Sequence, residues 1–461
     1  MTDFRQPEKH KRSTSTITYA DMKLAKLTHV QPPQSVEATW NLALHMPLNL
    51  PNEMVDMITD HLWDDKLSLR ACTLVCKQWL FSATSNLFRD ITATDDGSCH
   101  KFMDLGAFLS SSSIRSSIVR RSVRYLHLAN AEGVETPKPI TIPLNLLADI
   151  MRRCPRVRHV CLTGVRWQRN PKQPIPAVLC PAVTTLSLFY GADHLIPDVT
   201  GIFTWFPSVH RYDLQGGYMP MLQSYDQPTS EDAYPAPFPP LMSLSSLSMT
   251  SDEIPAWALD SIADTATVKT LNSLSIVLGN MDQVEAVGRL LESARHSLVH
   301  LHLDLTSPHF TESFLSRMCI PMSYSARKGS YAFTDCPHRI AQSLQGLSRC
   351  RAIERLQLTS RVCWDIPPVT TTPACIERII SIVEAQNVKH LILEFTGNLE
   401  HLPYQLTVPE WRVVDYALAQ HPIIQAVEIS WDEEWNAQGT QAMMCGFFPC
   451  VYNSGKLLCV D

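Results

Sequence analysis

The chain has 461 residues, and its 39 Lys and Arg against 45 Asp and Glu give a formal net charge of −6. Hydrophobic residues make up 45% and charged residues 18%, so the chain can bury a large core and global disorder is excluded. The length predicts either several domains or one small domain followed by a long repeat array. The mild acidity gives no electrostatic reason to expect a nucleic acid or an anionic membrane as a partner.

The 14 cysteines are too dilute for the disulfide scaffold that is typical of short secreted domains. No Cys-x-x-Cys pair occurs, so neither a zinc ribbon nor a thioredoxin-like motif is predicted. The first residues lack the apolar core of a secretory signal, and no apolar run is long enough to span a bilayer. We therefore expect a cytoplasmic or nuclear protein with reduced cysteines and no membrane partner.

The beginning of the chain divides into a polar segment and a helical segment. Residues 1–38 are polar and aperiodic and are predicted to form a disordered tail, whose basic cluster at 9–12 is typical of a nuclear address or of a solvated tail. Pro51 suits a first helical turn. A first helix is predicted from the spacing of Met54, Met57, Ile58, His61 and Leu62. Asp64 and Asp65 suit the start of a second helix, predicted from the spacing of Leu69, Cys72, Cys76, Trp79, Ala83 and Leu87.

From about residue 120 onward, short segments carry an apolar residue at every second position, which is typical of strands with one buried face. Ten such strands are predicted, centred on Leu126, Val160, Leu186, Tyr212, Leu247, Leu274, Leu301, Leu356, Leu391 and Val427. Most centres lie 26 to 36 residues apart, with one step of 55, and this period is typical of stacked repeats.

Apolar stripes at helical spacing lie between these strands, at 143–154, 281–297 and 375–387. Alternation of strand and helix with right-handed crossovers predicts a parallel sheet. We therefore predict an α/β fold with an irregular, leucine-rich-repeat-like solenoid and a curved parallel sheet over residues 120–461. Two interruptions, the proline-rich 226–240 and the Ser- and Tyr-rich 321–336, are predicted to be loops.

No sequence motif for common catalysis occurs: the phosphate loop, the dinucleotide-binding glycine motif, the nucleophile elbow and the zinc-protease helix are all absent. We therefore expect no catalytic residue and no cofactor. The sharpest metal candidate is the set His300, His302 and Asp304, which share one face of a predicted strand and present ligands that zinc accepts. The alternative interpretation of this set is the polar outer face of a half-buried strand, and on that interpretation no metal binds.

Two groups of cysteines allow more than one interpretation. Cys72 and Cys76 are four residues apart on the predicted second helix. They can be interpreted as a redox or metal pair, or as small hydrophobic residues in a packing surface. Cys445, Cys450 and Cys459 lie close together near residue 461 without the spacing of a metal site, and a disulfide among them stays an alternative.

Alternation along the predicted strands also indicates which side chains face away from the helices. In a solenoid these side chains line a concave surface that can bind a partner. The predicted target-binding residues are His127, Arg211, Asp213, His300, His302, Arg355, Gln357 and His390.

Residues 45–92 resemble the F-box, in the version seen in many fungal F-box proteins. The resemblance rests on Leu50-Pro51-x-Glu53 and on the string from Asp64 to Leu80, with Val75-Cys76-x-x-Trp79, and covers about a tenth of the chain. It implies a three-helix unit that docks onto the adaptor subunit of SCF ubiquitin ligases. The implied adaptor-binding residues are Leu50, Pro51, Glu53, Met54, Ile58, Leu62, Leu69, Val75, Cys76 and Trp79.

The order of the parts, a short F-box followed by leucine-rich-like repeats, also resembles that family. It implies a non-catalytic substrate-recognition subunit that binds the adaptor, through it a cullin, and an unknown target protein. The asparagine that usually follows the repeat strand is mostly missing here, so regular horseshoe geometry does not follow. Two alternatives stay open: an F-box and repeat scaffold that works outside the ligase, and a metal-dependent enzyme.

Overall fold

The computed structural model describes residues 50–96, 98–131, 140–168, 178–190, 205–216, 244–250, 256–264, 266–306, 336–362, 371–383, 388–397, 409–431 and 445–458. Four predicted features lie outside these ranges: the tail at 1–38, the loop at 226–240, the loop at 321–336 except Cys336, and Cys459. The chain divides into two compact units, residues 1–183 and residues 184–461, which we call the first and the second unit.

The first unit begins with three short helices, α2 Asn52–His61, α3 Lys66–Cys72 and α4 Lys77–Leu87. Asp65 caps α3, because its carboxylate accepts hydrogen bonds from the backbone N–H groups of Leu67 at 3.1 Å and Ser68 at 3.0 Å. The prediction of one long second helix was wrong. The Thr73 hydroxyl donates to the Arg70 carbonyl at 2.6 Å, the chain turns, and Cys76 is extended with φ −162°.

A small core with one polar layer holds these helices together. Val55, Leu69 and Ala83 are buried between them. Beside this core, Nδ2 of the buried Asn86 on α4 donates to Oδ1 of Asp60 at 2.8 Å and to Oγ1 of Thr59 at 3.3 Å on α2. These bonds span more than 25 residues of sequence, so they define how α2 and α4 pair.

The rest of the first unit is an α/β arrangement. Strands β1 Asp90–Asp95, β2 Tyr125–Asn130 and β4 His159–Thr163 pair in parallel, and a second sheet pairs β3 Ile140–Pro143 with β5 Val165–Gln168. The helices are α5 His100–Ser110, α6 Ile114–Ser122 and α7 Leu144–Arg153. The sequence predicted α7 and the strands β2 and β4, but it missed β1, β3 and β5.

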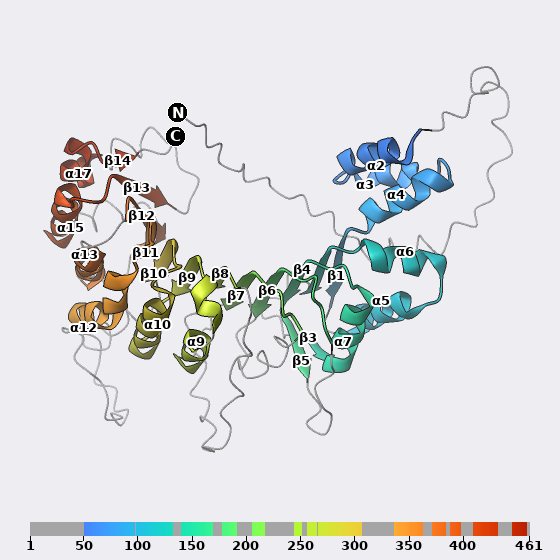
Figure 1. The fold of residues 1–461 in the computed structure, drawn as a ribbon, viewed down its shortest axis with the longest axis horizontal. Helices are drawn as coiled ribbons and strands as arrows, with labels where there is room; N and C mark the ends of the chain where they lie inside the picture. Colours follow the sequence, from blue (N-terminus) through green and yellow to red (C-terminus); the bar gives the residue numbers. More distant parts are fainter. Residues whose placement is uncertain are drawn as a thin grey trace, which may run out of the picture. The chain divides into compact units, whose positions relative to one another are not determined.

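The second unit repeats the same parallel pairing, and its strands follow one another in the sheet in chain order (Figure 1). These strands are β6 Thr185–Tyr190, β7 Arg211–Gly216, β8 Ser246–Met249, β9 Ser273–Val277, β10 His300–Asp304, β11 Arg355–Val362, β12 His390–Gly397, β13 Ala426–Trp431 and β14 Leu457–Leu458. Its helical elements are α9 Ala256–Ala263, η1 Ala266–Thr270, α10 Met281–Ala294, α12 Cys336–Ser343, η3 Leu344–Arg349, α13 Thr371–Val383, α15 Pro409–Gln420 and α17 Pro449–Asn453. The predicted α/β class with a parallel sheet is confirmed, and the arrangement is compatible with a solenoid-like fold.

The register of the strands confirms the predicted repeat alignment within each unit. Leu126 pairs with Val160 in the first unit, and in the second unit the paired residues are Leu186, Tyr212, Leu247, Leu274, Leu301, Leu356, Leu391 and Val427. All of them are buried, because this face of the strands packs against the helices. Two residues before most of these strands, a further apolar residue such as Val123, Leu271 or Leu298 is also buried.

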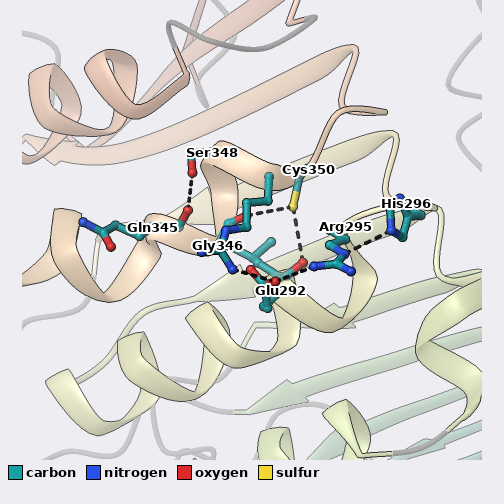
Figure 2. A network of polar contacts seen from close by, with 9 residues as sticks. Glu292, Arg295, His296, Gln345, Gly346, Ser348 and Cys350 are labelled. Atoms are coloured by element: carbon teal, nitrogen blue, oxygen red, sulfur yellow. Dashed lines mark hydrogen bonds and ion pairs between the residues drawn. The ribbon is translucent and has the colours of Figure 1, made fainter.

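Two glycines let α10 and η3 approach closely. A Cβ at Gly288 would collide with the Ser343 carbonyl, and a Cβ at Gly346 would lie 2.7 Å from the Gly288 carbonyl oxygen. Beyond this contact, Glu292 on α10 accepts hydrogen bonds from Arg295 at 2.8 Å and from Arg349 on η3 at 3.0 Å (Figure 2). The thiol of the buried Cys350 donates to the Leu291 carbonyl at 3.3 Å in the same region. No helix within the described ranges is long and apolar enough to cross a membrane.

Candidate functional site

The segment from α2 to α4, including the turns between its helices, carries more than half of the exposed large hydrophobic side chains in the part of the chain that the structure describes. Eight of its fifteen exposed large hydrophobic side chains lie between Met54 and Phe81. Leu74 is 84% and Leu67 is 75% exposed. The eight residues, which we call the helical apolar patch, are Met54, Met57, Trp63, Leu67, Leu74, Val75, Leu80 and Phe81. Large apolar side chains exposed within one short segment are available for a protein–protein contact.

The structure separates the predicted adaptor-binding residues into three groups. Five are exposed: Pro51, Glu53, Met54, Val75 and Cys76. Four are half-buried: Leu50, Ile58, Leu62 and Trp79. Leu69 is 0% exposed and therefore supports the helices from inside without reaching the surface.

Six members of the helical apolar patch were not among the predicted adaptor-binding residues: Met57, Trp63, Leu67, Leu74, Leu80 and Phe81. Leu74 lies in the turn that breaks the predicted second helix. Met57 belonged to the apolar stripe that predicted the first helix. Trp63, Leu67, Leu80 and Phe81 lie outside the predicted stripes, and their large apolar side chains were the available signal.

Two side-chain hydrogen bonds from Gln78 tie the start of α2 to α4. Nε2 of Gln78 donates to the Leu50 carbonyl at 2.7 Å and to Oδ1 of Asn52 at 2.8 Å. Pro51 lies between these two acceptors and is exposed. The Leu50-Pro51 segment is therefore held in place from α4 while its side chains stay accessible to a partner.

In the second unit, the strand face that points away from the helices carries a chain of polar side chains. His302 on β10 contacts Oγ of Ser275 on β9 through Nδ1 at 2.8 Å, and Oγ1 of Thr359 on β11 through Nε2 at 2.7 Å. Oγ1 of Thr359 donates to Oε2 of Glu394 on β12 at 2.7 Å. Nε2 of Gln357 donates to the same carboxylate oxygen at 3.0 Å. One hydrogen-bond chain therefore connects four neighbouring strands.

The donors and acceptors of this chain define the tautomer of His302. Glu394 only accepts, so Thr359 donates to it and must accept from Nε2–H of His302. Nδ1 then accepts from the Ser275 hydroxyl. Burial lowers the pKa of His302, although the negative charges of Asp304 and Glu394 act to raise it. Burial also raises the pKa of Asp304, although its hydrogen bond with Thr306 acts in the other direction. The imidazole is therefore neutral near pH 7.

Three of the predicted target-binding residues of the second unit form a row at the amino ends of the strands. His300, Arg355 and His390 are register partners on β10, β11 and β12. Nε2 of His390 lies 3.1 Å from Oε2 of Glu428, without hydrogen-bond geometry, and forms an ion pair only when the imidazole is protonated. Arg211, further along the sheet, holds the buried Asp213 through contacts of 2.9 and 3.1 Å from its Nε.

His127 is the one predicted target-binding residue in the first unit. Its Nε2 lies 2.9 Å from Oγ1 of Thr163, and its ring meets that of Tyr125 edge to face, with centroids 6.3 Å apart. The other seven predicted residues all belong to the second unit. The prediction therefore combined residues of two separate compact units.

The structure does not bring the proposed metal ligands together. Both ring nitrogens of His302 are engaged by hydroxyl groups. Within the described ranges, no group of three His, Cys, Asp or Glu side chains has the arrangement of a metal site. Among the described residues, Cys72, Cys76, Cys445 and Cys450 form no disulfide.

Comparison with known proteins gives no family. No family model and no curated protein matches the sequence. A crystal structure of a Bacteroides fragilis protein from a structural genomics consortium covers 75% of this chain and 76% of its own, with 8% identity and a TM-score of 0.36. A similarity this weak carries no conclusion about function.

Proposed function

We propose that this protein is a non-catalytic substrate-recognition subunit of an SCF-type ubiquitin ligase, working in the cytoplasm or the nucleus. The observation that carries the proposal is the helical apolar patch, which lies on three helices and the turns between them, in a segment whose sequence resembles the F-box. The described residues 50–96 place these helices directly before the first strand, β1.

The adaptor interface would bury the helical apolar patch. Each apolar side chain of this size contributes about 1.5–3 kcal/mol when it is transferred fully from water into a packed interface. The side-chain amides of Gln78 and Asn86 are already hydrogen-bonded within the unit, so these two donors keep their partners when the patch docks. Met54 and Val75 are the two members of the predicted adaptor set that belong to this patch.

The strand face of the second unit would bind the target protein. It presents exposed or half-buried His300, Arg355 and His390 beside the hydrogen-bonded chain through His302. A surface with donors, acceptors and positive charge fixes the orientation of a bound protein. Ubiquitination then follows from proximity, because tethering raises the effective concentration of the target near the ubiquitin-carrying enzyme. No covalent step is assigned to the chain itself.

The proposal is tested by capture of purified adaptor on the full chain. The double variant Met54→Asp and Val75→Asp places two charges on the helical apolar patch, and we expect adaptor capture to be lost. Ile114→Asp is the matched control, since Ile114 is 76% exposed on α6, outside the patch, and capture should persist. Equal capture by the double variant and the wild type would refute the proposal. A stable adaptor complex that recruits no cullin would favour the alternative of a scaffold outside the ligase.

A further inference from the structure

Three arginines occupy equivalent positions immediately before the three parallel strands of the first unit. Arg89 precedes β1, Arg124 precedes β2 and Arg158 precedes β4. The backbone N–H of Arg124 donates to the Arg89 carbonyl at 2.8 Å, and the N–H of Arg158 donates to the Arg124 carbonyl at 2.7 Å. Neighbouring strands lie about 4.8 Å apart, so the three side chains start from adjacent positions at the amino ends of the strands. We call these three residues the arginine row.

Two further arginines adjoin the arginine row. Nη1 of Arg124 donates to the carbonyl of Arg121 at 3.0 Å and to that of Arg156 at 3.5 Å. Arg124 is half-buried, and the other four side chains are exposed. Burial lowers the pKa of Arg124, and the positive charges of Arg156, Arg158 and Arg89 lower it further. The guanidinium groups of Arg89, Arg156 and Arg158 are therefore close enough to repel that of Arg124.

Three of the five arginines have no ion pair among the described residues. Arg89, Arg121 and Arg156 form no ion pair with any residue in the described ranges. The charges of Asp90, Arg89 and Asp64 all act on the pKa of Lys66, which burial lowers, so two carboxylates and two cations lie near one another at the start of β1. Arg89, Arg121 and Arg156 are therefore exposed positive charges without a described ion pair, in a chain of net charge −6.

The fold itself does not require arginine at these positions. In the second unit, the same backbone hydrogen bonds link the equivalent residues before β6 to β13, which are Thr184, His210, Ser245, Asn272, Val299, Glu354, Lys389 and Gln425. None of them is arginine. Like charges on neighbouring strands destabilise a sheet, so the arginine row lowers the stability of the first unit. Neutral residues such as Thr184 and Ser245 form the same backbone hydrogen bonds without this cost.

We propose that the arginine row, with Arg121 and Arg156, binds a short acidic segment of the target protein, rich in Asp and Glu. This inference rests on the proposed function, in which the chain captures a protein. Guanidinium groups bind carboxylates through two parallel hydrogen bonds, and they stay charged at every physiological pH. Five arginines match a few carboxylates of an extended segment, whereas a long polyanion would also meet the net negative charge of the chain.

The test measures binding of a fluorescent twelve-residue Asp/Glu peptide to the full chain by anisotropy. We expect the triple variant Arg89→Gln, Arg121→Gln and Arg156→Gln to weaken binding about tenfold or more, since these exposed side chains hold no described ion pair. Lys389→Gln is the matched control, because exposed Lys389 occupies the equivalent position before β12, and it should bind within about twofold of the wild type. Binding should also weaken as salt rises.

Three outcomes would overturn the inference: no peptide binding by the wild type, equal binding by the triple variant, or tighter binding of single-stranded RNA of the same length than of the peptide. Adaptor capture is measured on the same proteins. If the wild type captures the adaptor but does not bind the peptide, this inference alone is refuted. If the wild type binds the peptide but does not capture the adaptor, the proposed function alone is refuted.

Discussion

His302 and Thr359, which lie 57 residues apart in sequence, share a hydrogen bond of 2.7 Å between Nε2 and Oγ1 across strands β10 and β11. Thr359 is 2% exposed and passes the chain on to Glu394. This pair links the face that we assign to target binding with the packing of the sheet. Changes to it should therefore alter stability as well as recognition.

Removing the Thr359 hydroxyl should destabilise the second unit. Thr359→Val keeps the side-chain shape but leaves Nε2–H of His302 and one oxygen of Glu394 without this partner. We expect a loss of about 1–3 kcal/mol in the free energy of unfolding, measured by urea denaturation. Thr92→Val, at a half-buried strand position in the first unit, is the control and should change stability by less than about 0.5 kcal/mol. A neutral Thr359→Val would show that the hydrogen-bond chain does not stabilise the fold.

The stability of the protein should depend on pH through His302. Because burial lowers its pKa below the ordinary value of 6.5, the unfolded chain takes up the proton at a higher pH than the folded chain does. The contribution of His302 to stability is therefore present above about pH 6.5 and is lost as the pH falls toward its folded pKa. Asp304 acts in the opposite sense nearer pH 4, since its pKa is raised above 3.8.

His302→Gln should remove this dependence. Between pH 7.5 and 5.5, we expect the wild type to lose more free energy of unfolding than His302→Gln does, as followed by urea denaturation at each pH. His100→Gln, which changes an exposed histidine at the start of α5, should keep the wild-type dependence. Identical pH profiles for the wild type and His302→Gln would contradict the assignment.

The close approach of α10 and η3 should make Gly288 intolerant of a side chain. Gly288→Ala places a Cβ against the Ser343 carbonyl, and backbone must move to accommodate it. We expect a loss of about 1–3 kcal/mol in thermal or urea unfolding. Gly446→Ala is the matched control, because a Cβ at Gly446 meets nothing within 4 Å. Equal stability of both variants would mean that the two elements separate at little cost.

The polar layer between α2 and α4 should control the integrity of the helical apolar patch. Asn86→Ala removes the hydrogen bonds to Asp60 and Thr59 and should speed amide hydrogen exchange in both helices, with a local loss of about 1–3 kcal/mol. The neighbouring exposed Ser85→Ala is the control and should leave exchange unchanged. Unaltered exchange in Asn86→Ala would show that the apolar core alone holds the helices.

Alternation of apolar residues by itself determined the repeats of this protein. Leu274, Leu301 and Leu356 were aligned from sequence, and they are register partners in the sheet. This succeeds because a strand buries every second residue, so the period of two is a local property. Helical spacing succeeded for α7, α10 and α13 for the same reason. It failed at residues 73–76, where apolar spacing continued through a turn that a side-chain hydrogen bond to the backbone closes.

Only the tertiary structure decided which polar residues act together. Ser275, His302, Thr359 and Glu394 form one chain because their strands are neighbours, and Arg89, Arg124 and Arg158 form one row because β1, β2 and β4 are. The sequence missed β1, so Arg89 had no assigned place beside the other two. Polar side chains interact over a few ångströms across strands, while the chain between them runs for 27 to 57 residues, and no local period encodes that contact.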